Sequence, residues 1–571
     1  MKRFTARTGL LAGVAALALA ISACSGGSAG SSPGTTGSGG STAPAGSGSP
    51  ATAPGGTSSA STGTSSDGDQ PKYGGTLRIE DFVAATCISP DGSKAYPDSM
   101  ISNQLYDRLT YQDPDTAAIS PWLATDWTVN SDATVYTFNL RQGVTFSDKT
   151  PLNADVVAAN FDQLGKGDES LGVPVQVLLT GYDHAEVLGP YRVAIHFSQP
   201  NVGFLQATSN YRLGIVSLNT LKMSYNDRCQ GKGVAGSGPF VFESSVPDKE
   251  VVLARRDDYN WGPPALGHTG KAYLEKLDFT NVPESGVRVG ALLAGQADIA
   301  RGIFPTDESL VTSTPGYHLL IQDVGQSDYL AIKPDHPNLD DIRVRQALIY
   351  ATDREEFLKT VLSPSYKLAS SVLAPNNPGY TDLSSEIVYD PAKANALLDQ
   401  AGWTMGSDGI RVKNGQRLVI SAYPATSQPT AEAMLELFAI QWKKVGIELD
   451  IKQADAATYA KVSADPKLNA FTQTTPTRLD PDGLRQSWDG ASDVVSHDYP
   501  ELDKLVEEQN QTTDPAKRKQ IAAQAQKWIL DNALALPLFN DQMVYGAADY
   551  VKGVEHEPQG RAIYVTAWLD K

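Results

Sequence analysis

The chain has 571 residues and a formal net charge of -18, with 65 acidic against 47 basic side chains. This acidity argues against nucleic acid as a partner, because binding to phosphates needs basic patches. The length allows two or three domains.

Residues 1–23 are typical of an export signal. Lys2, Arg3 and Arg7 precede an apolar run at residues 10–21 that is too short for a permanent membrane span. Ile21-Ser22-Ala23-Cys24 resembles the bacterial lipobox, which predicts a lipid anchor such as palmitate on Cys24. The alternative is an ordinary signal peptide with an incidental cysteine. Either way, the chain is predicted to be exported.

A polar segment follows Cys24. Residues 25–72 contain no large apolar side chain, so they cannot bury enough surface to offset the entropy of ordering. We therefore expect residues 24–72 to form a Gly/Ser/Thr/Pro-rich disordered tether, and folding to start near Tyr73.

Cys87 and Cys229 form an even pair in an exported chain. A disulfide between them is the expected arrangement, and two separately buried thiols are the alternative. Neither cysteine lies in a C-x-x-C motif, the seven histidines are scattered, and no Walker A or G-x-G-x-x-G pattern occurs. We therefore predict no metal, no cofactor, no catalytic residue and no enzymatic activity.

The elements of the first half include two strands and a helix. In "TVYTFNL" every second residue from Tyr136 is apolar, and in "YRVAIHF" every second residue from Val193 is apolar. This period of two is typical of half-buried strands. Between them, Asn153 is a helix cap, and Phe161 lies on the apolar face of the helix that follows.

Helices dominate the second half. Asp390 caps a helix that starts at Pro391, and Phe438 and Trp442 share a helical face that ends before Gly446. A strand should follow at residues 447–451, and a helix carrying Trp528 should follow Asp514. The aromatic residues at helical spacing are expected in the core rather than against a ligand. The fold class is α/β.

Several stretches in chain order resemble family 5 of the extracellular solute-binding proteins, the peptide, nickel and oligosaccharide receptors of ABC importers. They are "PWLATDWTVNSDATVYTFNLRQGVTFSDKTPLNADVV", "GSGPFVFES", "RRDDYNWG", "ALLAGQADIA", "DDIRVRQALIYATDR" and "YDPAKANALLDQAGW". The chain departs from the pattern at Lys149, which replaces the usual glycine of a turn.

The resemblance implies a two-lobed periplasmic-binding-protein-like fold of type II. Lobe I would comprise residues 73–304 with an extra subdomain at about 110–215, lobe II residues 305–530, and residues 531–571 would return to lobe I. The protein would act as a monomeric receptor on the outer face of the bacterial cell membrane. It would deliver a peptide or other small solute to permease subunits driven by cytoplasmic ATPases.

The family's ligand position departs from its usual form here. In peptide-binding members an acidic residue three positions before an Asp-Pro pair receives the ligand's ammonium group, and alignment on Asp480 puts Thr477 there. Thr477 cannot supply the charge. Arg478 would instead bind an anionic group, or pair with Asp480 or Asp482.

Three aromatic residues complete the predicted ligand-binding set. Trp488 would stack on a ring of the solute or pack against its own lobe, and Tyr96 and Tyr423 lie on loops that line the cleft in the family. A peptide or modified peptide ranks first as ligand, then a small anionic or aromatic solute, then an oligosaccharide, and nickel as a chelate ranks last. The alternatives of another class are an exported hydrolase and an adhesin or sensory protein.

Overall fold

The computed structural model describes residues 70–93, 96–426, 428–474, 478–489 and 499–571. Cys24 and Thr477 lie outside these residues, as do the predicted export signal and most of the predicted tether. In the described part of the chain, no helix is both long and apolar enough to cross a membrane.

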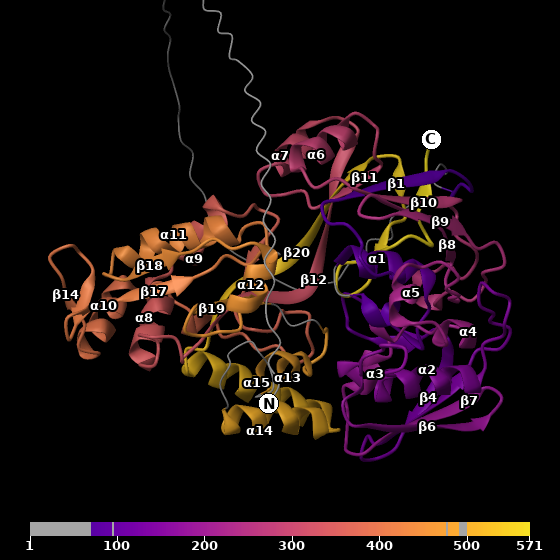
Figure 1. The fold of residues 1–571 in the computed structure, drawn as a ribbon, viewed down its shortest axis with the longest axis horizontal. Helices are drawn as coiled ribbons and strands as arrows, with labels where there is room; N and C mark the ends of the chain where they lie inside the picture. The colour runs from indigo at the N-terminus through magenta and orange to yellow at the C-terminus, as the bar shows by residue number, and fades with distance from the viewer. Residues whose placement is uncertain (1–69, 94–95, 427, 475–477, 490–498) are drawn as a thin grey trace, which may run out of the picture. The chain divides into compact units, whose positions relative to one another are not determined.

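A mixed sheet of nine strands organises the described chain (Figure 1). Eight strands follow in this spatial order: β19 (Phe471–Thr474), β12 (Tyr317–Ile332), β20 (Ala535–Ala548), β11 (Ile299–Arg301), β1 (Thr76–Asp81), β10 (Lys276–Asn281), β9 (Glu250–Arg255) and β8 (Phe240–Val246). The ninth strand, β13 (Lys367–Leu368), pairs with β20. β1 is parallel to β10 and β11, whereas β12 and β20 are antiparallel.

A second sheet carries the strands predicted in the first half. Its order is β4 (Ala124–Val129), β5 (Val135–Leu140), β7 (Arg192–Phe197) and β6 (Tyr182–Gly189). Helix α2 (Ala154–Lys166) begins where the Asn153 side chain accepts a hydrogen bond from the backbone N–H of Val156 at 3.0 Å. Phe161 is buried in the first hydrophobic core, so both strands and the capped helix are confirmed.

The first core draws on residues 77–299 and again on residues 545–567. The remaining elements of this region are α1 (Tyr96–Leu105), β2 (Thr110–Gln112), β3 (Ile119–Pro121), α3 (Phe204–Ala207), α4 (Leu218–Leu221), α5 (Tyr225–Cys229), β21 (Val551–Lys552), β22 (Glu555–His556), β23 (Ala562–Ile563) and β24 (Trp568–Leu569). Helices α6 (Ser285–Leu293) and α7 (Glu308–Ser313) belong to a small third cluster that also includes Val544 of β20. The region also contains short 3-10 turns at Pro90–Gly92, Val177–Leu179, Tyr211–Leu213 and Pro264–Leu266.

The second core draws on residues 329–539. Its elements are α8 (Ile342–Ala351), α9 (Arg354–Thr360), a 3-10 turn at Ser384–Glu386, α10 (Pro391–Gln400), β14 (Thr404–Met405), β15 (Arg411–Lys413), β16 (Gln416–Arg417), β17 (Val419–Ala422), α11 (Ala431–Lys443), β18 (Glu448–Ile451), α12 (Ala456–Val462), α13 (Gly483–Trp488), α14 (Pro500–Gln511) and α15 (Pro515–Asp531).

The elements predicted in the second half are confirmed. Asp390 caps α10, and Gly446 takes a φ of 85° between the end of α11 and β18. Phe438 and Trp442 are fully buried, whereas Trp528 packs at the edge of the core. The Trp528 ring lies 5.2 Å from the Tyr499 ring, and its Nε1–H donates to the Glu501 carboxylate at 3.1 Å.

Strands β12 and β20 belong to both cores. They lie side by side in Figure 1 and pair from Tyr317 opposite Ala548 to Ala331 opposite Ala535. One end of the pair contributes Tyr545 to the first core, and the other end contributes Leu330 and Leu536 to the second. The pairing is interrupted between Asp323 and Ser327, where the register shifts. These two strands therefore connect the two cores, and the irregularity lies between them.

Candidate functional site

An isolated carboxylate lies just beyond this irregularity. Asp328 on β12 is only 1% exposed, and Gln473 on β19 donates through Nε2 to each of its two oxygens at 3.1 Å. No cation in the described part of the chain pairs with Asp328. Burial raises the pKa of Asp328 well above its ordinary value, and the nearby Asp541 carboxylate raises it further.

Two further carboxylates extend this acidic region. Asp541 lies on β20, and burial raises its pKa to about 6, with a smaller contribution from the charge of Asp323. The backbone N–H of Gln542 donates to the Asp541 carboxylate at 2.8 Å, and the backbone N–H of Gly325 donates to Asp323 at 3.0 Å. The short stretch of β12 and β20 between the two cores therefore carries three carboxyl groups, and two of them have raised pKa values.

Tyr423 lies next to this region. It follows β17, and its backbone N–H donates to the Asn469 side-chain oxygen at 3.1 Å. Tyr423, Leu330 and Gln473 line one small cavity of about 10 Å³. The Oε1 atom of Gln473 is buried and has no hydrogen-bond partner within the part of the chain that the structure describes. Gln473 thus donates to Asp328 and lines a cavity together with Tyr423.

Tyr96 lies in a different, charge-balanced cluster. Its hydroxyl is 3.4 Å from the Tyr545 hydroxyl, and the guanidinium groups of Arg301 and Arg561 lie over its ring at 4.5 and 4.9 Å. Each of these arginines has its own carboxylate. Arg301 donates two hydrogen bonds of 2.6 Å to Asp81, and Arg561 donates to Glu557 at 2.9 Å.

Arg478 is engaged within the chain. It is 3% exposed, pairs with Asp482, and donates from Nε to Gln206 Oε1 at 2.8 Å and from Nη2 to the carbonyl oxygen of Gly203 at 2.5 Å. The pairing with Asp482 is one of the alternatives that the sequence leaves open. These contacts join α3 of the first core to the segment before α13, and ligand binding by Arg478 stays a prediction.

Trp488 is 2% exposed and stacks on the Tyr329 ring, with ring centroids 5.5 Å apart. Both residues belong to the second core, so this contact is packing of Trp488 within its own core. The predicted ligand position Thr477 lies outside the described residues.

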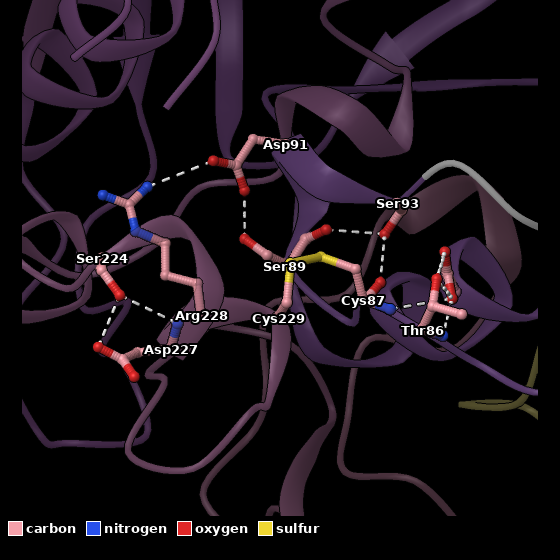
Figure 2. Close-up of a disulfide and its surroundings, with 10 residues drawn as sticks. Thr86, Cys87, Ser89, Asp91, Ser93, Ser224, Asp227, Arg228 and Cys229 are labelled. Carbon is pink, nitrogen blue, oxygen red and sulfur yellow. Dashed lines mark hydrogen bonds and ion pairs between the residues drawn. A yellow bond between two sulfur atoms is a disulfide. The ribbon is translucent and has the colours of Figure 1, made fainter. Parts of the chain in front are cut away.

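The two cysteines of the folded part form a disulfide (Figure 2). Cys87 follows β1 and Cys229 ends α5, 142 positions later, which matches the pairing predicted from the cysteine count. The backbone N–H of Cys87 donates to the Asp98 carboxylate at 3.1 Å. A cavity of about 210 Å³ adjoins Cys229, but Asp328, Tyr96 and Tyr423 do not line it. Among the described residues, no group of three or more His, Cys, Asp or Glu could hold a metal ion.

Comparison with known proteins identifies the family. The model of the bacterial extracellular solute-binding proteins, family 5 (middle), matches residues 118–496. The chain belongs to this family. It is therefore a solute-binding protein of the kind that serves ABC importers of peptides or nickel, it works outside the cytoplasm, and it is not an enzyme.

Individual family 5 relatives differ in what they bind. A di/tripeptide-binding protein of Pseudomonas aeruginosa is 26% identical over 76% of this chain and 83% of its own length. The nickel-binding periplasmic protein of Escherichia coli is also 26% identical, over 81% of this chain and 88% of its own.

Solved structures of family 5 share the two-lobed fold. The oligopeptide-binding protein AppA from Bacillus subtilis, in complex with a nonapeptide, has a TM-score of 0.73 at 20% identity. The match covers 88% of this chain and 100% of the AppA chain. NikA from Brucella suis, in complex with Fe(III)-EDTA, has a TM-score of 0.75 at 24% identity. The match covers 87% of this chain and 100% of the NikA chain. This similarity confirms the predicted two-lobed α/β fold.

Sequence reasoning about family 5 missed Asp328, Gln473 and Asp541. One signal was available, because "SDYLAI" places a charged residue at the start of an otherwise apolar strand pattern. The burial of Asp328 and its separation from any cation depend on residues more than a hundred positions away.

Proposed function

We propose that this family 5 protein captures a small peptide or another small solute between two lobes and delivers it to a membrane permease. The proposed lobes are residues 73–304, with an extra subdomain at about 110–215, and residues 305–530, with residues 531–571 returning to the first lobe. The observation that carries the proposal is the pair of strands β12 and β20, which belong to both cores and carry the buried Asp328 between them.

Hinge bending at these strands would open and close the site. The register shift between Asp323 and Ser327 leaves part of the β12–β20 ladder unpaired, which makes it the natural place for a bend. A solute closes the protein only if it makes stronger contacts in the closed state. Tyr96, Tyr423 and Thr477 remain the proposed ligand contacts from the family pattern, and the contacts of Arg478 and Trp488 within the chain favour structural roles for these two residues.

We also propose that Cys24 carries the lipid anchor and that residues 24–72 act as the tether of a monomeric receptor. The support is the sequence pattern around Cys24. In cells fed radiolabelled palmitate, the wild-type protein should take up label and Cys24→Ser should not. Equal labelling of both forms would contradict the anchor.

The function is tested by mass spectrometry of solutes released when the purified protein is denatured. We expect a peptide or another small solute, and cells lacking the protein should lose uptake of that compound. An oligosaccharide or an anionic aromatic compound would support the alternative ligand classes. Unchanged uptake of every solute tested would favour an adhesin or sensory role.

A further inference from the structure

We propose that Asp328, assisted by Asp541, binds a positively charged ammonium group of the solute. This inference rests on the proposed function and specifies the chemistry of the ligand. It assigns the recognition of charge to strands β12 and β20, rather than to the segment before Asp480 where the family places its acidic residue.

The first argument is the cost of burying a carboxylate without a cation. Removing an ion from water costs several kcal/mol after relaxation, unless the ion is paired and hydrogen-bonded. Two other buried carboxylates have cations: Asp81 has Arg301, and Asp298 has Arg78 and Lys571. Buried Asp107 and Glu308 each accept hydrogen bonds from two neutral side chains. Among the described residues, the side-chain partner of Asp328 is one neutral amide, that of Gln473. An ammonium group of a solute would supply the missing partner.

The second argument is an unsatisfied acceptor beside Asp328. Oε1 of Gln473 is buried without a hydrogen-bond donor, while Nε2 of the same side chain is held by Asp328. Buried polar atoms in folded proteins nearly always have a partner. An ammonium group has three N–H donors, so it would satisfy both Asp328 and Gln473 Oε1.

The third argument is the surroundings. Gln473 shares its cavity with Tyr423, whose ring offers a cation a favourable aromatic face. Asp541 adds a second negative charge, as its influence on the pKa of Asp328 shows. An anionic group placed here would meet like charges in a medium of low dielectric constant. The region therefore selects for cations.

The ammonium group has two plausible sources, a peptide N-terminus and an alkyl amine. Tri-alanine, N-acetyl-tri-alanine and putrescine distinguish them by isothermal titration of the full protein. Tri-alanine or putrescine should bind, and acetylation should weaken tri-alanine by about 30-fold or more, as loss of a buried charged contact does. Whichever of tri-alanine and putrescine binds identifies the source of the ammonium group.

Asp328→Asn tests the assignment of the residue. It should weaken binding of the amine about 10- to 100-fold. It should also release at least about tenfold less amine-bearing solute, detected by dansylation, when protein from the native host is denatured. Asp549→Asn, which removes an exposed carboxylate just after β20, is the matched control and should change neither value.

A cooperative unfolding transition checks that Asp328→Asn folds, and Asp541→Asn provides a second variant with a smaller expected loss. If neither acetylation of the solute nor Asp328→Asn changes its affinity, the inference is overturned, whereas the proposed function still holds. If the wild-type protein neither binds these probes nor releases any solute, and uptake is normal without it, the proposed function itself fails.

Discussion

Two regions of the second core differ in whether their buried carboxylates are paired with cations. Around α13 and α15, Asp480 receives two hydrogen bonds from Arg518, at 2.6 and 3.0 Å, and Asp482 pairs with Arg478 and Arg485. On β12, Asp328 is buried more deeply than Asp480 but pairs with no cation in the described chain. The carboxylates around α13 and α15 are therefore paired with arginines of the same chain, whereas the described residues supply no cation to Asp328.

The difference separates structural from functional charge. A paired buried carboxylate holds its neighbours in position, and the pair is costly to break because one ion is then left uncompensated. An unpaired buried carboxylate destabilises the free protein, and proteins tolerate such groups mainly at functional sites. On this reasoning, substitutions in the two regions should have effects of opposite sign on stability.

The largest effect is expected from Arg518→Met. It leaves Asp480 buried without its partner, and we expect a loss of about 3–5 kcal/mol in the free energy of unfolding. Urea denaturation followed by circular dichroism measures this loss. Lys527→Met removes an exposed pair with Asp531 on the same helix and should cost no more than about 0.5 kcal/mol. Equal effects of the two substitutions would remove the distinction between the regions.

A smaller effect is expected from Arg478→Met. This side chain connects the segment before α13 with Gln206 and Gly203, so its loss should weaken the contact between the two cores by about 2 kcal/mol. The measurement is small-angle scattering with and without the released solute. The variant should stay more open than the wild type at the same solute concentration, and identical compaction would argue against this role.

Asp328→Asn should act in the other direction on stability. Burying this carboxyl group costs free energy whether it stays ionised or takes up a proton, so Asp328→Asn should raise the free energy of unfolding of the solute-free protein by about 1–2 kcal/mol at pH 7. Thermal unfolding at matched concentrations tests this expectation. A destabilised Asp328→Asn variant would mean that the carboxylate has a structural role in the free protein.

The smallest effect concerns pH and Asp541. Its pKa rises from 3.8 to about 6 on folding, so the folded protein keeps a proton that the unfolded chain releases. The stability from this proton is complete below about pH 4 and is lost as the pH rises through about 6. Asp541→Asn should therefore flatten the fall in stability between pH 4 and 7 by about 1 kcal/mol. An unchanged pH profile would show that Asp541 titrates normally.

The sequence by itself determined the local elements and the family. Asn153 and Asp390 cap α2 and α10 because a side-chain oxygen satisfies a nearby backbone N–H, an interaction that needs only a few consecutive residues. The strands β5 and β7 and the helix α11 follow from apolar periodicity, which is equally local. The motifs that resemble family 5 build the same local turns and helices, so they could be recognised without the fold.

Only the tertiary structure decided which charges are paired. Asp480 and Asp328 each lie next to an apolar residue in the sequence, Leu479 and Tyr329. In the described structure, however, Asp480 meets Arg518, whereas the partner of Asp328 is Gln473, 145 positions away. The cost of a buried charge depends on every group within a few ångströms, and those groups come from distant parts of the chain. For the same reason the sequence pointed to Arg478 as a possible ligand contact, whereas folding places Asp482, Gln206 and Gly203 around its guanidinium group.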